Sequence, residues 1–234
     1  MALLFQMNNG EQWRTGMNST GVFVVNTPAG FYAQQVASVP DPATGNPDPA
    51  KLKAFFAAHP ETAPFRAWVK AHKPSSTLAN ATYYSLNAFQ LVAADGSRRF
   101  VRWAMVPLQP YAPVADPATL DHDFLSNDLA HQLHQGPVRW RLVLTLANSG
   151  DITDDATQAW PLDRATIDAG TLTLTSTVPQ TDGACRDVNF DPTILPHGIE
   201  TSNDPLLAAR SGAYANSFHR RLFEEAAAKP GAAP

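Results

Sequence analysis

Residues 202–221 read SNDPLLAARSGAYANSFHRR, and this stretch predicts the helix around which the rest of the chain is organised. Ser202 or Asn203 can cap a helix, because both side chains accept hydrogen bonds from free backbone N–H groups. Pro205 then falls in the first turn, where its missing N–H costs no hydrogen bond. The helix is therefore expected to begin close to Pro205.

The same helix places a cation beside a phenol. At 3.6 residues per turn, Arg210 and Tyr214 lie on one stripe of the helix, which continues through Phe218 and Arg221. A guanidinium one turn away favours the phenolate form of Tyr214. A phenolate on a rigid helix is a hard anionic ligand for ferric iron, and tyrosinate is one of the axial ligands that haem proteins use. The residues alone also allow a plainer interpretation, in which the tyrosine is buried and the two arginines extend to solvent.

Composition limits the class of protein. The chain has 234 residues, of which 44% are hydrophobic, so it can form one globular domain with a sizeable core. Its formal net charge is -4 and it has no long run of Lys or Arg, which argues against nucleic acid or an anionic membrane as the main partner. Cys185 is the only cysteine, which excludes an internal disulfide and a cysteine-rich zinc site. A small molecule is the expected partner.

No targeting or membrane segment is expected. The apolar start at residues 1–5 is too short for a signal sequence and lacks a basic flank. No apolar run approaches the length of a membrane span. We expect a soluble protein, a monomer or a small homo-oligomer, in either the cytoplasm or the periplasm.

Hairpin signals and alternating apolar residues predict an antiparallel sheet. Asn9-Gly10 and Asp95-Gly96 are dipeptides typical of tight hairpin turns. From Val138 onwards apolar and polar residues alternate, as in a half-buried strand. The six predicted strands are residues 2–7, 12–20, 83–94, 98–108, 138–147 and 170–178.

Helical periodicity, with apolar residues three and four positions apart, predicts the insertions between these strands. Thr27 and Pro28 begin a short helix that extends to Ala37. Further helices are expected over residues 50–58, 61–72 and 116–134. Loops are expected over residues 39–49 and 149–164, and an irregular arm over residues 179–201.

Five blocks of the sequence, taken in order along the chain, identify a family resemblance. They are MNSTGVFVVNTPAGF at residues 17–31, AFQLVAADG at 88–96, RWRLVLTLAN at 139–148, DDATQAWPLDRATIDAGTLTLT at 154–175 and NFDPTILPHGIETSNDPLLAARSGAYANSFHRR at 189–221. The last block closely resembles the haem-proximal segment of catalases and of the small catalase-related peroxidases, and the other four resemble blocks of that family in the same order. Because the blocks are collinear and span nearly the whole chain, the chain is identified as a member of the catalase superfamily.

The resemblance implies that haem b is the cofactor and that its iron is bound by the predicted helix. Tyr214 matches the axial iron ligand, and Arg210 matches its charge partner. Asp204 matches the acidic residue that holds this arginine. Arg221 falls where the family places an arginine against a haem propionate, a charge-assisted pairing that suits a guanidinium.

On the other face of the haem, the resemblance implies a pocket made of an amide and two aromatic rings. Asn18 matches the catalytic asparagine that helps to position peroxide, and Phe23 and Phe31 match pocket aromatics that contact the cofactor. Without the resemblance, Asn18 would be an ordinary amide at the end of a strand, and the two phenylalanines would be ordinary core residues.

The chain also departs from the family. Asn87 stands where full-size catalases have a histidine, so the hydrogen-bond relay to Arg210 is expected to be neutral, and Gly21 stands where they have a proline. The family's distal histidine, which takes the proton from bound peroxide, lies upstream of the asparagine matched by Asn18, whereas no histidine precedes Asn18 in this sequence. The resemblance therefore implies an N-terminal truncation that removes this histidine and the first two strands of an eight-stranded barrel.

The expected fold is α+β. It would be a catalase-like antiparallel β-barrel core, with about six of eight strands present, helical insertions and a C-terminal helix that carries the haem ligand. Residues 1–225 would form this haem-binding domain, and residues 226–234 would form a flexible tail. A barrel without two of its strands is expected to leave two sheet edges unpaired.

The expected function is that of a haem-dependent peroxidase, which reduces hydrogen peroxide or organic hydroperoxides with an organic reductant and has little or no catalase activity. The short segments between the blocks, and the lack of a large domain after the Tyr214 helix, favour a peroxidase over a dismutating catalase. Two alternatives stay open. One is a non-catalytic protein that binds haem or a small apolar ligand, which the missing distal histidine favours, and the other is a hydroperoxide-rearranging enzyme similar to allene oxide synthase.

Overall fold

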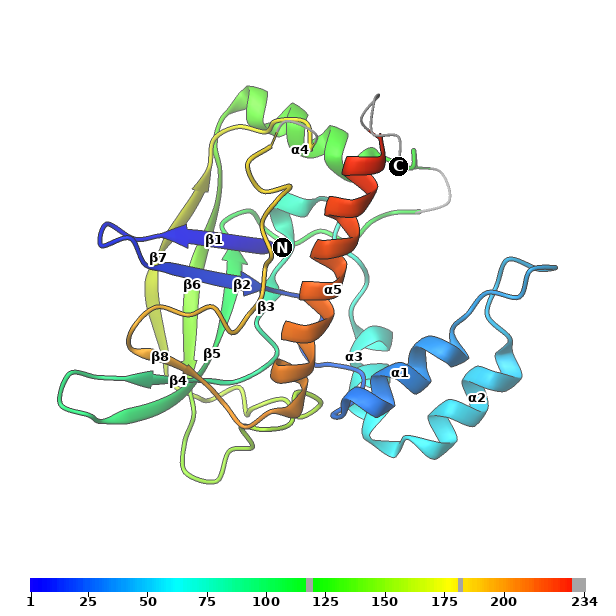
Figure 1. The fold of residues 1–234 in the computed structure, drawn as a ribbon, viewed down its shortest axis with the longest axis horizontal. Helices are drawn as coiled ribbons and strands as arrows, with labels where there is room; N and C mark the ends of the chain where they lie inside the picture. Colours follow the sequence, from blue (N-terminus) through cyan, green and yellow to red (C-terminus); the bar gives the residue numbers. More distant parts are fainter. Residues whose placement is uncertain (117–119, 181–182, 229–234) are drawn as a thin grey trace.

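The computed structural model describes residues 1–116, 120–180 and 183–228, and within these ranges the chain has the predicted α+β class (Figure 1). The strands are β1 (Ala2–Gln6), β2 (Gln12–Gly16), β3 (Tyr83–Tyr84), β4 (Phe89–Val92), β5 (Arg98–Pro107), β6 (Val138–Leu146), β7 (Thr166–Leu174) and β8 (Ile199–Thr201). The α-helices are α1 (Pro28–Ala37), α2 (Pro49–Ala58), α3 (Ala63–Ala71), α4 (Phe124–Gln135) and α5 (Pro205–Ala228), with short 3-10 helices at Pro60–Thr62 and Leu78–Asn80.

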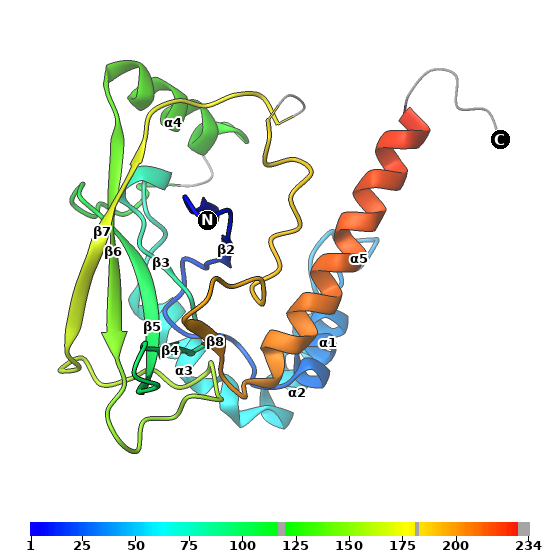
Figure 2. The same ribbon diagram turned by 60° about the vertical axis from the view of Figure 1, so that its left-hand side comes forward.

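The strands form two antiparallel sheets. The larger sheet has the order β7-β6-β5-β4-β8, with β3 also paired to β5, and the smaller is the β1-β2 hairpin. Figure 2 shows the hairpin between the larger sheet and α5. A single bridge between Asn18 and Tyr84 joins the hairpin segment to the larger sheet. Among the described residues no ladder closes the two sheets into a barrel, so the closed form of the family's barrel is not present here.

Two hairpin turns confirm the predictions made from their residues. Gly10 has a φ of 88° and Gly96 a φ of 82°, a region that glycine enters without a steric penalty. In the first hairpin Phe5 pairs with Trp13, and in the second Phe89 pairs with Val101. The turns therefore fix the register in which both hairpins bury their aromatic side chains.

Long-range geometry corrects several predicted bounds. The predicted strand at residues 83–94 is interrupted between β3 and β4, where Leu86 has a φ of 65°. The predicted arm at residues 179–201 is not wholly irregular, because β8 at its end pairs with β4, with Phe89 opposite Thr201. This pairing joins segments more than a hundred residues apart, so no local pattern predicts it.

The ends of four other elements also differ from their predicted positions. Strand β2 ends at Gly16 rather than residue 20, and β7 begins four residues before the predicted start at residue 170. Helix α4 begins at Phe124, and of the earlier residues predicted to be helical, residues 117–119 lie outside the described ranges. Helix α5 continues through Ala228, three residues into the predicted tail, of which residues 229–234 are not described.

An aromatic core fixes the hairpin against the larger sheet. The Trp13 ring meets the edge of the Trp103 ring at 5.0 Å between centroids, and Phe89 stacks on Trp103 at 4.2 Å. The indole N–H of Trp103 donates to the hydroxyl of Thr15 at 3.0 Å, so its buried polar atom is satisfied. Burial of one such aromatic side chain stabilises the folded state by about 1.5–3 kcal/mol. Trp13 on β2 is the buried aromatic residue that the hairpin contributes. The end of β2 is therefore held in a defined place.

Helices α1, α2 and α3 gather on one side of the molecule, beyond α5 (Figure 1). Thr27 caps α1 as predicted, since its hydroxyl accepts from the N–H of Gly30 at 3.1 Å. Val25 and Phe55 are buried in a second apolar cluster between α1 and α2. Within the described residues no helix has the length and apolar character needed to cross a membrane.

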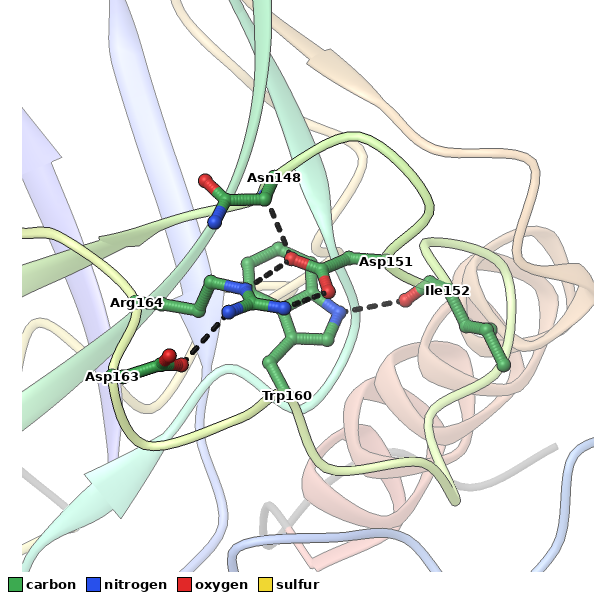
Figure 3. A network of polar contacts seen from close by, with 6 residues as sticks. All are labelled: Asn148, Asp151, Ile152, Trp160, Asp163 and Arg164. Carbon is green, nitrogen blue, oxygen red and sulfur yellow. Dashed lines mark hydrogen bonds and ion pairs between the residues drawn. The ribbon is translucent and has the colours of Figure 1, made fainter.

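A polar network ties together the loop between β6 and β7, which was predicted as a loop at residues 149–164. Arg164 donates to both carboxylate oxygens of Asp151, at 2.8 and 2.9 Å, and the indole N–H of Trp160 donates to the carbonyl of Ile152 at 2.7 Å (Figure 3). The guanidinium of Arg102 lies 4.6 Å from the centre of the Trp160 ring, which connects the loop to β5. The loop is therefore an ordered part of the structure.

Candidate functional site

A cavity of about 820 Å³ lies between the end of β2, helix α1, the turn before β4 and helix α5. Its walls are mostly apolar, with contributions from Met17, Phe23, Leu86 and Leu206. A few polar side chains also face it, among them Asn18, Asn87, Arg210 and Tyr214. This size and this mixture of many apolar and few polar groups are typical of sites for cofactors and small ligands.

Helix α5 presents the Arg210-Tyr214 pair to this cavity. The Arg210 guanidinium lies 5.6 Å from the centre of the Tyr214 ring, as predicted from their one-turn spacing. Its Nη2 also donates to the phenol oxygen at 3.4 Å and to the carbonyl of Gly16 at 2.9 Å. The phenol oxygen therefore has a fixed positive charge beside it.

A polar chain continues from Arg210 into the protein. Arg210 Nη1 donates to the side-chain oxygen of Asn87 at 2.7 Å, and the Asn87 amide nitrogen donates to a carboxylate oxygen of Asp204 at 2.8 Å. The prediction of a neutral side chain in the relay to Arg210 is confirmed. Among the described residues no ion pair joins Asp204 to Arg210 directly, so the carboxylate holds the arginine through Asn87 rather than by contact.

Asp204 has a second partner and a perturbed carboxyl group. Its other oxygen accepts from the N–H of Leu206 at 2.9 Å, which caps the first turn of α5. Burial raises the pKa of Asp204, and the hydrogen bond from Asn87 opposes that rise. The carboxyl group is thus buried, accepts a hydrogen bond at each oxygen and lies at the start of the helix that carries Tyr214.

The residues predicted for the opposite face also reach the cavity. Asn18 lies at its edge, and the side-chain oxygen of Asn18 accepts from the N–H of Thr20 at 3.2 Å, which leaves the amide N–H₂ group available. The rings of Phe23 and Phe31 are 5.4 Å apart and line the same cavity, with Phe31 39% exposed. The structure therefore brings Asn18, Phe23, Phe31, Arg210 and Tyr214 around one space.

The loop at residues 149–164, whose polar network Figure 3 shows, supports this opposite face. The N–H of Phe23 donates to the carbonyl of Ala156 at 2.8 Å, and Asn26 donates to Asp155 at 3.2 Å. Asp155 in turn accepts from the hydroxyl and the N–H of Thr157. The position of Phe23 thus depends on a loop that lies more than a hundred residues further along the chain.

Arg221 lies away from the cavity in this structure. It is seven residues beyond Tyr214 on α5, and its guanidinium donates to the carbonyl of Val188 at 3.3 Å and to the hydroxyl of Ser217 at 3.4 Å. It also lies 5.7 Å from the centre of the Phe218 ring, as the predicted stripe requires. Its assignment to a propionate stays a prediction.

Sequence reasoning missed other cavity residues. Leu86 and Gly16 line the cavity, and so do Tyr32 and Gln35 on α1. The signal available for the α1 residues was the helical spacing from Phe31, which places them near the same opening. For Gly16 and Leu86 the sequence offers no comparable signal, because their position depends on how β2 and the turn before β4 meet α5.

Two absences among the described residues limit the chemistry. No histidine lines the cavity, and no group of three or more His, Cys, Asp or Glu side chains is arranged to hold a metal ion. A protein-derived metal centre of the nitrogen, sulfur or carboxylate type is therefore not present in these ranges. Among the described residues that line the cavity, Tyr214 is the phenol whose oxygen lies beside a guanidinium.

Comparison with known sequences gives a consistent result. A family model described as Catalase matches residues 1–230. A catalase-related peroxidase of Synechococcus elongatus is 39% identical over 223 residues, and one of Mycolicibacterium paratuberculosis is 32% identical over 224 residues. Both alignments cover 94% of this chain, and they cover 66% and 70% of the two relatives. The chain thus spans about two thirds of their length.

Comparison with solved structures shows the fold. A bacterial catalase superposes with a TM-score of 0.81 at 20% identity, and catalase A from Saccharomyces cerevisiae with 0.82 at 19% identity. Each superposition covers 94% of this chain, and 46% and 48% of those chains. The described arrangement of sheet, hairpin and α5 is therefore a catalase-like fold, of which this chain spans about half the length.

Proposed function

The chain belongs to the catalase family, and on this basis we propose that it is a haem-dependent peroxidase, which reduces hydrogen peroxide or organic hydroperoxides with an organic reductant and has little or no catalase activity. The observation that carries the proposal is the Arg210-Tyr214 pair at the wall of an apolar cavity, held from behind by Asn87 and Asp204. The names of the two relatives, both catalase-related peroxidases, support a peroxidase over a catalase.

The residues present fit haem b. The cavity of about 820 Å³ is within the range of cofactor sites, its walls are mostly apolar, and one phenol oxygen faces it beside a guanidinium. Tyr214 would ligate the iron, and Phe23 and Phe31 would hold the apolar part of the cofactor. When bound, the haem would supply a ferric iron at which the peroxide O–O bond is cleaved.

The protein's own contribution begins on α5. Arg210 places a positive charge beside the phenol oxygen of Tyr214, and three acceptors hold its guanidinium there, namely the Gly16 carbonyl, the Asn87 amide and the phenol itself. A phenolate at this position would be a hard anionic ligand for ferric iron. The buried hydrogen bonds of Asn87 fix the direction of the guanidinium, so the pair needs no rearrangement when the cofactor binds.

The opposite face contributes less. The Asn18 amide N–H₂ group can donate to a peroxide oxygen, and Phe23 and Phe31 present apolar surface to the cavity. No histidine lines the cavity within the described residues. A positioned acid or base contributes typically ~10²-10⁴-fold to such a reaction, so the described chain is expected to react slowly with hydrogen peroxide. That expectation favours a slow peroxidase over a rapid catalase.

Titration of the purified protein with hemin tests the proposal, with Tyr214→Phe as the matched variant. The wild-type chain should give a high-spin ferric spectrum with tyrosinate ligation, and the variant should lose it and bind hemin at least about 10-fold more weakly. Identical spectra for the two proteins would remove Tyr214 from the site. Turnover of cumene hydroperoxide and of hydrogen peroxide with a phenolic reductant then ranks the substrates.

One observation favours a second candidate. Because no described histidine faces the cavity, the chain could be a non-catalytic protein that binds haem. Tight hemin binding without turnover of either peroxide would support this candidate over the peroxidase. Product analysis with a lipid hydroperoxide covers the remaining enzyme class, since a rearranged product formed without a reductant would indicate an activity similar to that of allene oxide synthase.

A further inference from the structure

Gly16 ends strand β2 directly opposite the Arg210-Tyr214 pair. Its backbone is not left-handed, unlike Gly10 and Gly96, whose positive φ values explain the glycine at those turns. The partner of Gly16 in the hairpin is Ala2, in regular antiparallel register. The backbone at this position would therefore accept any residue that suits a strand, and the glycine needs another explanation.

The explanation lies in the space beside the phenol oxygen. A Cβ atom added at Gly16 would lie 3.1 Å from the Tyr214 oxygen, 3.1 Å from Arg210 Nη2 and 3.9 Å from the carbon that bears the hydroxyl. Contacts of 3.1 Å are shorter than ordinary van der Waals distances, so the phenol and the guanidinium would both have to move. The missing side chain thus leaves room for both groups.

The backbone of Gly16 acts on the same pair. Its carbonyl accepts a hydrogen bond from Arg210 Nη2 at 2.9 Å, and that nitrogen is also the one that reaches the phenol oxygen. One residue therefore supplies an acceptor that orients the guanidinium and the empty space into which the phenol fits. Trp13 and Met17, which flank Gly16 in the sequence, are packed in the buried core, so the backbone at Gly16 is not free to shift away from α5.

We infer that Gly16 is a positioning residue for the axial ligand. Its carbonyl and its missing side chain together set the distance between Arg210 and the Tyr214 oxygen. This inference rests on the proposed function where haem binding is concerned. The packing of Gly16 against Arg210 and Tyr214 involves only residues of this chain.

Two substitutions of increasing size test the inference by hemin titration. Gly16→Ala adds the atom that meets both groups, and Gly16→Val adds two more methyl groups on a residue type that strands favour. Both variants should bind hemin about 10- to 100-fold more weakly, the effect of disturbing a partner of a metal ligand, with valine the worse of the two. The absorption bands of tyrosinate ligation should also shift. Wild-type affinity and spectrum in Gly16→Val would overturn the inference.

Gly212→Ala is the matched control, because this glycine lies on α5 two residues from Tyr214 and has nothing within 4 Å of its missing side chain. Alanine is favoured over glycine inside a helix, so this variant should unfold at a higher temperature and bind hemin with unchanged affinity. A loss of affinity in Gly212→Ala as large as in Gly16→Ala would show that any added methyl group near α5 disturbs the site, and it would contradict a specific role for Gly16.

A double-mutant cycle in the hemin-free protein separates this inference from the proposed function. Gly16→Ala, Tyr214→Phe and the double variant are compared by urea denaturation. Gly16→Ala should raise the unfolding equilibrium constant, because the added Cβ crowds the phenol and the guanidinium. Removal of the phenol oxygen relieves one of these short contacts, so the rise should be smaller in the Phe background, by at least about twofold. Additive effects would overturn the inference. If the wild-type chain bound no hemin, the proposed function would fail while the cycle would still decide the role of Gly16.

Discussion

The two sides of the cavity are built differently. On the α5 side, Asp204, Asn87, Arg210 and Tyr214 form one continuous hydrogen-bonded chain, and Asp204 and Asn87 are almost completely buried. On the side of β2 and α1, Asn18 is exposed and its amide oxygen has one local partner. The first side is fixed by its own contacts, whereas the second depends on the loops behind it.

This difference shows where stability and chemistry are linked. In a buried polar chain each side chain is the hydrogen-bond partner of the next. Removal of one therefore leaves a buried polar group without a partner, which is costly in the low-dielectric interior. An exposed amide such as that of Asn18 can exchange its partner for water at little cost. Substitutions on the α5 side should therefore affect folding and ligand binding together, and substitutions on the other side should affect them separately.

The largest effect is expected for Asn87→Leu. The change removes the donor to Asp204 and the acceptor of Arg210 while it keeps the number and branching of side-chain heavy atoms, so a buried carboxylate loses its partner. The free energy of unfolding should fall by about 3 kcal/mol, measured by urea denaturation at pH 7. Asn18→Ala is the control on the opposite side and should change it by less than about 0.5 kcal/mol. Equal losses in the two variants would contradict the distinction between the two sides.

The next effect concerns packing behind the Asn18 side. A Cβ atom added at Gly21 would lie 2.8 Å from the indole nitrogen of Trp68 on α3, so Gly21→Ala must displace that ring. The expected loss of unfolding free energy is about 1–2 kcal/mol. The loss should shrink in a Trp68→Phe background, because the smaller ring leaves room for the methyl group. A loss that is the same in both backgrounds would show that the indole does not limit this position.

A smaller effect is expected from the loop that supports Phe23. Hydrogen bonds from Arg164 and from the N–H of Asn148 lower the pKa of Asp151 to about 2, below its ordinary value of 3.8. The carboxylate therefore stabilises the folded state above about pH 4, and this contribution is lost as the pH falls towards 2. Denaturation of wild type and Asp151→Asn between pH 2 and 6 should give curves that converge at the acid end. Asp163→Asn is the control, since Asp163 is largely exposed.

Burial raises the pKa of Asp204, so its linkage has the opposite sign. Stability from this group declines as the pH rises above the ordinary range of an aspartate, because the folded state then must hold a buried charge. Asp151, in the loop that supports Phe23, and Asp204, at the start of α5, thus respond to pH in opposite directions. Asp204→Asn should remove this decline above about pH 4 and leave the loss of stability below it unchanged, as measured by denaturation over a pH series.

The smallest effect on folding, and a moderate one on chemistry, is expected for Asn18→Ala. The variant loses one hydrogen bond to a peroxide oxygen, worth about 0.5–1.5 kcal/mol, so peroxidase turnover should fall by about 2- to 12-fold. Hemin affinity should stay unchanged, because Asn18 contributes no ligand to the iron. Steady-state kinetics with cumene hydroperoxide on hemin-loaded protein measures this. A parallel loss of hemin affinity would place Asn18 in the cofactor site rather than at the peroxide.

Local signals explain what the sequence could predict. The turn residues Gly10 and Gly96 predicted both hairpins, and the spacing of Arg210 and Tyr214 predicted a cation over a phenol ring, because each depends on residues close in the chain. The resemblance identified the family and the neutral side chain of Asn87. The roles toward haem stay predictions for all the site residues, namely Asn18, Phe23, Phe31, Asp204, Arg210, Tyr214 and Arg221.

Contacts between distant segments explain what the sequence could not predict. The pairing of β8 with β4, the support of Phe23 by the carbonyl of Ala156, and the approach of Gly16 to Tyr214 each join residues far apart in the chain. Neither hydrophobic periodicity nor turn dipeptides predict contacts between segments that lie so far apart in the sequence. The indirect contact of Asp204 with Arg210 belongs to the same class, since it depends on which atoms of Asn87 face each partner.

No natural amino acid can both relieve the backbone strain at Leu86 and fill the space of its buried side chain. Its φ of 65° is unfavourable for any residue with a Cβ, yet its buried side chain packs with Ala156 and Leu206 in the cavity wall. Glycine would relax the backbone but leave a hole in the wall, and every larger residue would keep the strain. Attempts to raise the heat resistance of this protein by sequence optimisation should therefore leave this position alone, because its backbone presents Asn87 to the relay.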